Sequence, residues 1–140
     1  FISSRILIFV IIGIFVGIYF NSQKIDIKEE NVQVNYIDVS AQEAKELIDN
    51  NPDLIIIDVS PNYAKGHLPG AINYYVGDGS LDNAISSGEL DLNAIYLVYC
   101  HVDSASRGGA QKLINAGFEN IYRLSSHYSG WVDAGYEIEI

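Results

Sequence analysis

The only cysteine of this sequence, Cys100, lies in the stretch VYCHVDSASRGGAQKL, where an apolar run ends and a glycine-marked helical pattern begins. At the carboxyl end of a parallel strand, a thiol would face the unpaired amide N–H groups of the following helix, which favour an anion. We therefore predict that Cys100 is a nucleophile and that the helix lowers its thiol pKa. The alternative, an inert cysteine that fills space in the core, stays open.

The residues directly after Cys100 are the candidate binding loop for a sulfur anion. Backbone amides of residues 101–107 would form the cradle, and the hydroxyls of Ser104 and Ser106 would add donors. Arg107 has two interpretations that the sequence leaves open, a cation for an anionic ligand and a solvated helix residue. The predicted substrate-binding residues are His101, Val102, Asp103, Ser104, Ala105, Ser106 and Arg107.

Composition excludes several classes of function. The chain has 140 residues and a formal net charge of -10, so it offers no basic stripe for nucleic acid and we expect no nucleic-acid partner. One cysteine rules out an internal disulfide and any site with several cysteine ligands. The three histidines, His67, His101 and His127, show no metal-ligand spacing, and we expect neither a metal ion nor a cofactor.

Three apolar runs predict the strands that position Cys100. Residues 54–59, 94–100 and 120–124 are continuous runs of the kind found in parallel strands covered on both faces. Cys100 is the last residue of the second run. Helical patterns alternate with these runs, so we predict an α/β fold in which helices wrap a parallel sheet.

The helix signals are local. Ser40 and Glu43 form a capping pair that predicts a helix start, and Asn50 to Pro52 predict its end. A second helix follows Cys100 and is expected to finish at Gly117. Weaker helical patterns cover residues 80–90 and the surroundings of Trp131.

Four segments together resemble the rhodanese-like (sulfurtransferase) domain family over residues 36–140: IIIDVSPNYAKGHLPGAIN, LVYC, LINAGFENIYRL and GWVDAGY. The resemblance implies the rhodanese-like fold and a Cys100 that carries sulfur as a persulfide between a small sulfane-sulfur donor and a thiol acceptor. It also implies that Asp58 supports the site as the strand-end aspartate of the family. His67 matches the histidine of the Gly-His-Ile-Pro motif, and we expect it to be structural.

The candidate loop departs from the family pattern. Active members often have Arg or Lys one and five residues after the cysteine and Gly three after it, where this chain has His101, Ala105 and Asp103. We expect an anionic donor such as thiosulfate to be held less well by such a loop. The oxyanion-binding phosphatase version of the fold needs arginine where this chain has Ser106, which disfavours phosphate chemistry.

The first residues form a separate part of the chain. Residues 5–20, RILIFVIIGIFVGIYF, carry no charge after Arg5 and are apolar on every side of a helix. Residues 1–20 would span about 30 Å as a helix, the thickness of a bilayer core. We predict a hydrophobic membrane anchor at 1–20, a polar linker at 21–31 and a rhodanese-like domain at 32–140, with the domain outside the cytoplasm.

Residues 1–20 also resemble the N-terminal helix of mature type IV pilin subunits, although Arg5 stands where that family usually has glutamate. The resemblance implies self-assembly into an extracellular filament that displays the domain. Three functions are therefore carried forward. They are a membrane-tethered sulfurtransferase or sulfur carrier, a structural filament subunit, and a weakly catalytic domain used for protein binding.

Overall fold

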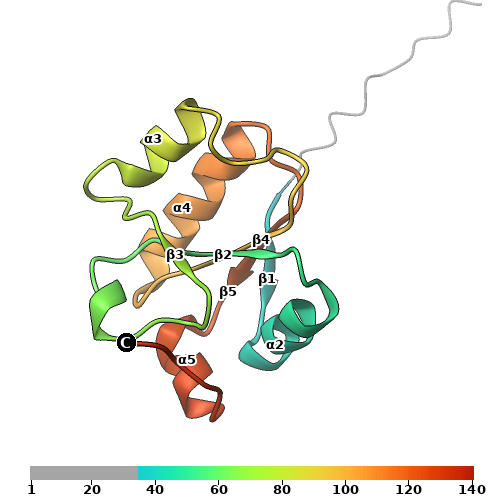
Figure 1. The fold of residues 1–140 in the computed structure, drawn as a ribbon, viewed down its shortest axis with the longest axis vertical. Helices are drawn as coiled ribbons and strands as arrows, with labels where there is room; N and C mark the ends of the chain where they lie inside the picture. The colour runs from blue at the N-terminus through green and yellow to red at the C-terminus, as the bar shows by residue number, and fades with distance from the viewer. Residues whose placement is uncertain (1–34) are drawn as a thin grey trace, which may run out of the picture. The chain divides into compact units, whose positions relative to one another are not determined.

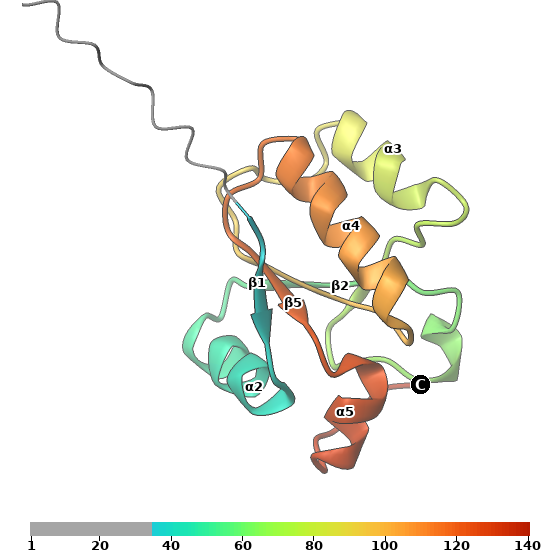
Figure 2. The same ribbon diagram turned by 180° about the vertical axis from the view of Figure 1, so that it is seen from behind.

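A computed structural model describes residues 35–140. Helices α3 and α4 cover one face of a central sheet, and α2 and α5 cover the other (Figures 1 and 2). The elements in chain order are β1 (Ile37–Val39), α2 (Ala41–Asn50), β2 (Ile55–Asp58), the 3-10 turn η1 (Tyr63–Lys65), β3 (Ile72–Asn73), α3 (Ser80–Ser86), β4 (Tyr96–Tyr99), α4 (Asp103–Asn115), β5 (Ile121–Leu124) and α5 (His127–Asp133).

The sheet has the strand order β1-β5-β4-β2-β3, and every neighbouring pair is parallel. The predicted α/β fold with a helix-wrapped parallel sheet is confirmed. The three apolar runs of the sequence became β2, β4 and β5, the inner strands. Because parallel strands end at the same edge, Asp58 of β2 lies in register with Tyr99 of β4.

Strand β4 is shorter than predicted, and Cys100 is the first residue beyond it. At Tyr99 the carbonyl still accepts the amide of Val59, at 3.0 Å. At Cys100 the carbonyl instead accepts the amide of Tyr128, also at 3.0 Å, so the backbone leaves the sheet there and is fastened to α5.

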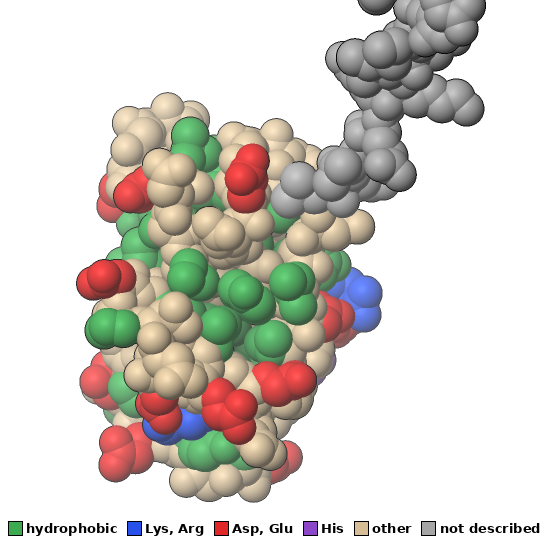
Figure 3. Space-filling model, turned by 90° about the vertical axis from the view of Figure 1, so that its right-hand side faces the viewer, with side chains coloured by type: hydrophobic (Ala, Val, Ile, Leu, Met, Phe, Trp, Pro, Cys, Tyr) green, Lys and Arg blue, Asp and Glu red, His purple; other side chains and the backbone are tan. Residues whose placement is uncertain are grey.

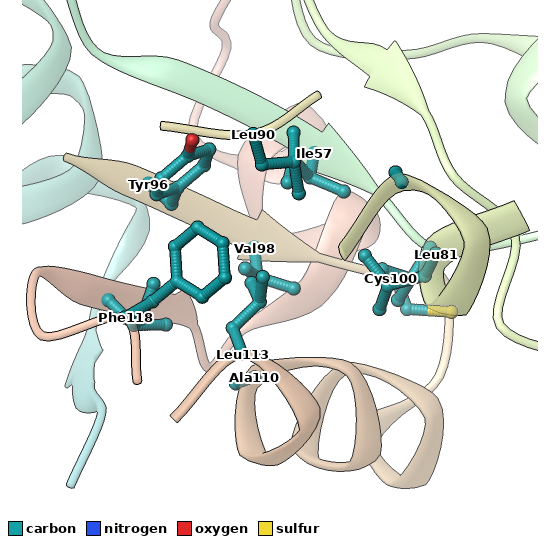
Figure 4. Packing of buried hydrophobic residues seen from close by; sticks show 12 residues of the cluster. Ile57, Leu81, Leu90, Tyr96, Val98, Cys100, Ala110, Leu113 and Phe118 are labelled. Atoms are coloured by element: carbon teal, nitrogen blue, oxygen red, sulfur yellow. The ribbon is translucent and has the colours of Figure 1, made fainter. Parts of the chain in front are cut away.

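Alternating residues of β4 serve the two halves of the core. Tyr96 and Val98 pack beneath α3 and α4, whereas Leu97 and Tyr99 face α2 and α5. Cys100 continues the first series, and Figure 4 shows it next to Leu81 of α3. Side chains along a strand point alternately to the two faces of the sheet, and helices cover both faces here. Both sets of β4 side chains are therefore buried, which explains why residues 94–100 are apolar throughout.

The helix boundaries follow the expected signals. Ser40 caps α2 as predicted, because its Oγ accepts the Glu43 amide at 3.2 Å while Glu43 Oε2 accepts the Ser40 amide at 2.7 Å. Helix α2 ends at Asn50, just before Pro52. Gly117 follows α4 with a φ of 96°, the left-handed geometry that a helix-ending glycine supplies.

The predictions for residues 1–31 lie outside the described residues. Within residues 35–140, the helices are too short or too polar for any of them to cross a membrane. On the face shown in Figure 3, Asp and Glu side chains surround a central group of hydrophobic side chains, and Lys and Arg are few. This acidic surface agrees with the net charge and offers little attraction to a polyanion.

We expect Ser40→Ala to lower the free energy of unfolding by about 1 kcal/mol, because the first turn of α2 loses its side-chain acceptor. The fluorescence of Trp131, the only tryptophan and a buried one, reports the transition in urea. Gln42→Ala on the same helix is the control and should leave the midpoint nearly unchanged. Equal midpoints for the two variants would contradict the capping role.

Candidate functional site

Cys100 is 1% exposed and lies where the carboxyl ends of β2 and β4 meet the start of α4. Two residues, His101 and Val102, separate it from the helix, and their backbone amides favour the ionised form of its thiol. The sequence prediction of a cysteine beside a helix N-terminus therefore agrees with the observed placement. These two amides belong to the first two residues of the predicted cradle.

The ionisation of Cys100 differs from the expectation. Burial raises the pKa of the Cys100 thiol, and the charge of Asp58 adds to the rise. The amides of Val102 and His101 favour the thiolate but do not outweigh the loss of water around the sulfur. The predicted lowering of the thiol pKa is thus wrong, because desolvation exceeds the effect of the helix terminus.

The predicted loop residues divide by exposure. Val102, Ser104 and Arg107 are exposed, and Ser106 is fully buried. The Ser106 hydroxyl donates to the Asp103 carbonyl at 3.0 Å and accepts from Arg123 at 3.2 Å. It is engaged inside the domain. The remaining three, His101, Asp103 and Ala105, are half-buried.

The one cation of the 101–107 segment is paired. Arg107 Nε donates to Asp103 Oδ2 at 2.5 Å, one helical turn away, and both side chains are about half exposed. This bond, followed by that from Arg123, lowers the pKa of Asp103, so its carboxylate stays ionised. Of the two interpretations of Arg107, the structure favours the solvated helix residue, and the loop presents no unpaired cation to a ligand.

Asp58 lies in a buried hydrogen-bond network at the carboxyl ends of β2 and β4. It is fully buried, its Oδ1 accepts the Ser60 amide at 2.8 Å and its Oδ2 accepts the Tyr99 hydroxyl at 3.1 Å. That hydroxyl accepts the Leu68 amide at 3.0 Å, and burial raises the pKa of Tyr99. Asp58 thereby joins the ends of β2 and β4 to the loop that contains His67.

His67 makes the contacts of a structural residue. Its ring stacks on Tyr63 at 3.7 Å between centroids, and its Nδ1 lies 3.0 Å from the Tyr63 carbonyl. Its backbone forms a two-bond antiparallel bridge with Glu139. Through these contacts, His67 holds its own turn together and connects it to the segment that contains Glu139.

Helix α5 closes the other side of the Cys100 loop. The ring of Tyr128 stacks on His101 at 4.2 Å, and burial lowers the pKa of His101, which favours its neutral form. Gly66 leaves room for the Tyr128 hydroxyl, because a Cβ there would overlap it. His127 has a φ of 64°, an uncommon conformation for a residue other than glycine, and its Nε2 lies 3.9 Å from Asp103 Oδ1.

Sequence reasoning missed Arg123. This residue of β5 is 1% exposed, and its guanidinium makes two bonds of 2.7 Å to Asp38 and one of 2.7 Å to Asp103. The signal was a single arginine inside the apolar run NIYRL, which predicts a buried charge that requires acidic partners. Only the tertiary structure identifies those partners.

Comparison with known proteins gives the family. The model of the rhodanese-like domain matches residues 40–134. This chain belongs to the rhodanese-like domain family. Two similar proteins are thiosulfate sulfurtransferases GlpE: that of Pseudoalteromonas translucida is 28% identical over 104 residues, covering 73% of this chain and 93% of that protein. That of Glaesserella parasuis is 24% identical, covering 78% and 98%.

Solved structures agree with this rhodanese-like assignment. The solution structure of the rhodanese-like domain of Anabaena Alr3790 superposes with a TM-score of 0.64 at 28% identity, covering 73% of this chain and 77% of that one. The crystal structure of a thiosulfate sulfurtransferase from Pseudomonas aeruginosa gives 0.64 at 26% identity, over 74% of this chain and 20% of that chain. The expected rhodanese-like fold is confirmed.

The raised thiol pKa gives a testable pH profile. We expect the alkylation rate of Cys100 by iodoacetamide to rise through a midpoint above 9.0, the ordinary value, because the buried thiol resists ionisation. Folded protein binds this proton more tightly than unfolded protein, so the stability it contributes is present below pH 9 and lost as the pH rises further.

The control is the same chain unfolded in guanidinium, whose cysteine should titrate near the ordinary value. The stability of Cys100→Ser should depend less on pH above 9 than that of the wild type. A folded-state midpoint below the unfolded one would overturn the assignment.

Proposed function

We propose that this chain is a sulfur carrier or sulfurtransferase that acts through a persulfide on Cys100. In the first step the thiolate attacks the terminal sulfane sulfur of a donor, and the bond between that sulfur and the rest of the donor breaks. The leaving group departs with the electron pair, as sulfite from thiosulfate or as a polysulfide shortened by one sulfur. In the second step an acceptor thiolate takes the outer sulfur and releases the Cys100 thiolate.

The observation that carries the proposal is the placement of Cys100. In a member of the rhodanese-like family, the one cysteine of the chain lies at the end of a central strand, and the amides of His101 and Val102 act on its sulfur. An outer persulfide sulfur is an anion as well, and the amides of the first turn of a helix such as α4 have no acceptor within the helix. His101, Val102, Asp103, Ser104, Ala105, Ser106 and Arg107 remain the proposed substrate-binding residues.

The electrostatics of the site favour a donor of low charge. Arg107 is paired with Asp103, and burial, with a smaller contribution from the charge of Asp58, raises the pKa of the Cys100 thiol. Thiosulfate is a dianion whose sulfonate would need a cation in the loop, whereas hydrogen polysulfide carries a single charge and has no such group. We therefore propose polysulfide-type donors ahead of thiosulfate.

Intact-mass spectrometry of the full chain in mild detergent tests the proposal. After exposure to polysulfide we expect a gain of one sulfur atom that added thiol acceptor removes, and a rate with thiosulfate at least tenfold lower. Cys100→Ser is the matched control and should gain nothing, because a hydroxyl cannot form the persulfide.

Absence of an adduct from both donors, in protein shown to be folded by Trp131 fluorescence, would overturn the sulfur-carrier proposal. It would leave a rhodanese-like domain kept for binding or display. An equal rate with both donors would retain the carrier and contradict the electrostatic argument about the loop.

We further propose that residues 1–20 tether the domain to a membrane, with the domain outside the cytoplasm. The support is the uncharged apolar sequence after Arg5. The pilin-like pattern of the same residues supports the alternative, assembly through this segment into an extracellular filament.

Cell fractionation followed by electron microscopy separates the two. A tethered protein should stay with the membrane fraction after shearing and dissolve in detergent as single subunits. Sheared fibres that contain this chain would overturn the tether and support the filament, and recovery in the aqueous fraction without fibres would contradict both.

A further inference from the structure

The guanidinium of Arg123 joins the edge of the sheet to the start of α4. Its Nε and Nη2 donate to the two carboxylate oxygens of Asp38 on β1, each at 2.7 Å. Its Nη1 donates to Asp103 Oδ1 at 2.7 Å and to Ser106 Oγ at 3.2 Å. The ring of Tyr36 lies 5.8 Å from the guanidinium carbon. The Arg123 side chain thus connects β1 with α4, two elements that are far apart in the sequence.

Stability alone does not account for a charge in this position. Burying a guanidinium in a strand is expensive, and a hydrophobic residue of similar size is often as stable or more stable there. What a planar guanidinium supplies is geometry, because its donors point in fixed directions and match carboxylates on two sides. The arrangement around Arg123 therefore indicates a role in placing Asp103 and Ser106.

Those two residues determine how the Cys100 loop is held. Asp103 is the first residue of α4, and the preceding Val102 has no side chain able to cap the helix. The loop is also attached to α5, through the bond from the Tyr128 amide to the Cys100 carbonyl and the stacking of the Tyr128 ring on His101. Between the Cys100 carbonyl and Asp103 lie only His101 and Val102, whose amides act on the Cys100 thiol.

We propose that Arg123 is a positioning residue which, through Asp103 and Ser106, aims the amides of His101 and Val102 at the Cys100 sulfur. It touches neither donor nor acceptor. The proposal deepens the sulfur-carrier function proposed above and rests on it for its biological meaning, but its structural content is measurable without any sulfur transfer.

The decisive variant is Asp103→Asn, which replaces the ion pair at the α4 end of the link by a weaker neutral contact and leaves the Arg123–Asp38 pair and the longer bond to Ser106 in place. Electrostatics alone predicts that losing a carboxylate lowers the pKa of Cys100. Loss of positioning predicts the opposite, because the thiolate loses its amide donors. The midpoint of the alkylation pH profile distinguishes the two, since it is independent of how easily the reagent enters.

We expect Asp103→Asn to raise this midpoint in the full chain by about half a pH unit, a roughly threefold change in the acid constant. Amide hydrogen exchange at His101 and Val102 should become faster by a similar factor. Asp82→Asn is the matched control: its carboxylate is similarly exposed and also bridges α4 to another element, through Lys112 at 2.7 Å, but at the far half of the helix. It should leave both readouts unchanged.

Arg123→Lys keeps the charge and loses the planar fork, so it should shift the midpoint in the same direction as Asp103→Asn. If Arg123→Lys does not fold, the Asp103→Asn result decides alone. A midpoint that falls or stays constant in Asp103→Asn would overturn the positioning role. A shifted midpoint in protein that gains no sulfur would support Arg123 as a positioning residue while the sulfur-carrier function fails.

Discussion

Strand β4 is paired on both edges and covered on both faces, so its backbone is held by contacts on every side. Its carboxyl end is therefore a fixed point from which the next residues must turn away from the sheet. Cys100 is the first of those residues, and α4 starts three positions later. The placement of the thiol follows from the burial of the strand, and the loop needs only a few bonds to complete it.

Charge is balanced closely around this fixed point. Arg123 and Arg107 are both bound by Asp103, and Asp38 takes the other side of Arg123. The result is a network whose acidic and basic groups satisfy one another rather than a ligand. Sulfur chemistry at Cys100 would then depend on backbone amides, which offer partial positive charge but no full counter-charge to an anionic donor.

Sequence patterns predicted most of the fold because the decisive signals are local. The capping pair of Ser40 and Glu43, the apolar runs of β2, β4 and β5, and the glycine after α4 each act over a few residues. The site was less predictable. The pKa of Cys100 depends on how completely the thiol is desolvated, and the partners of Arg123 come from positions 85 and 20 residues away. Neither the desolvation of Cys100 nor the partners of Arg123 can be predicted from the residues next to them in the sequence.

The pairing of β1 with β5 has a consequence for how the chain is made. Residues leave the ribosome in order, so β1 is synthesised well before β5, the strand that pairs with it. During that interval Ile37 and Asp38 lack their native neighbours. In the same way, His67 is synthesised before Glu139, with which its backbone pairs. Glu139 lies late in the domain, and its backbone bonds hold the turn that contains His67. The sheet edge at β1 and the turn at His67 can therefore be completed only after residues 121–139 are available.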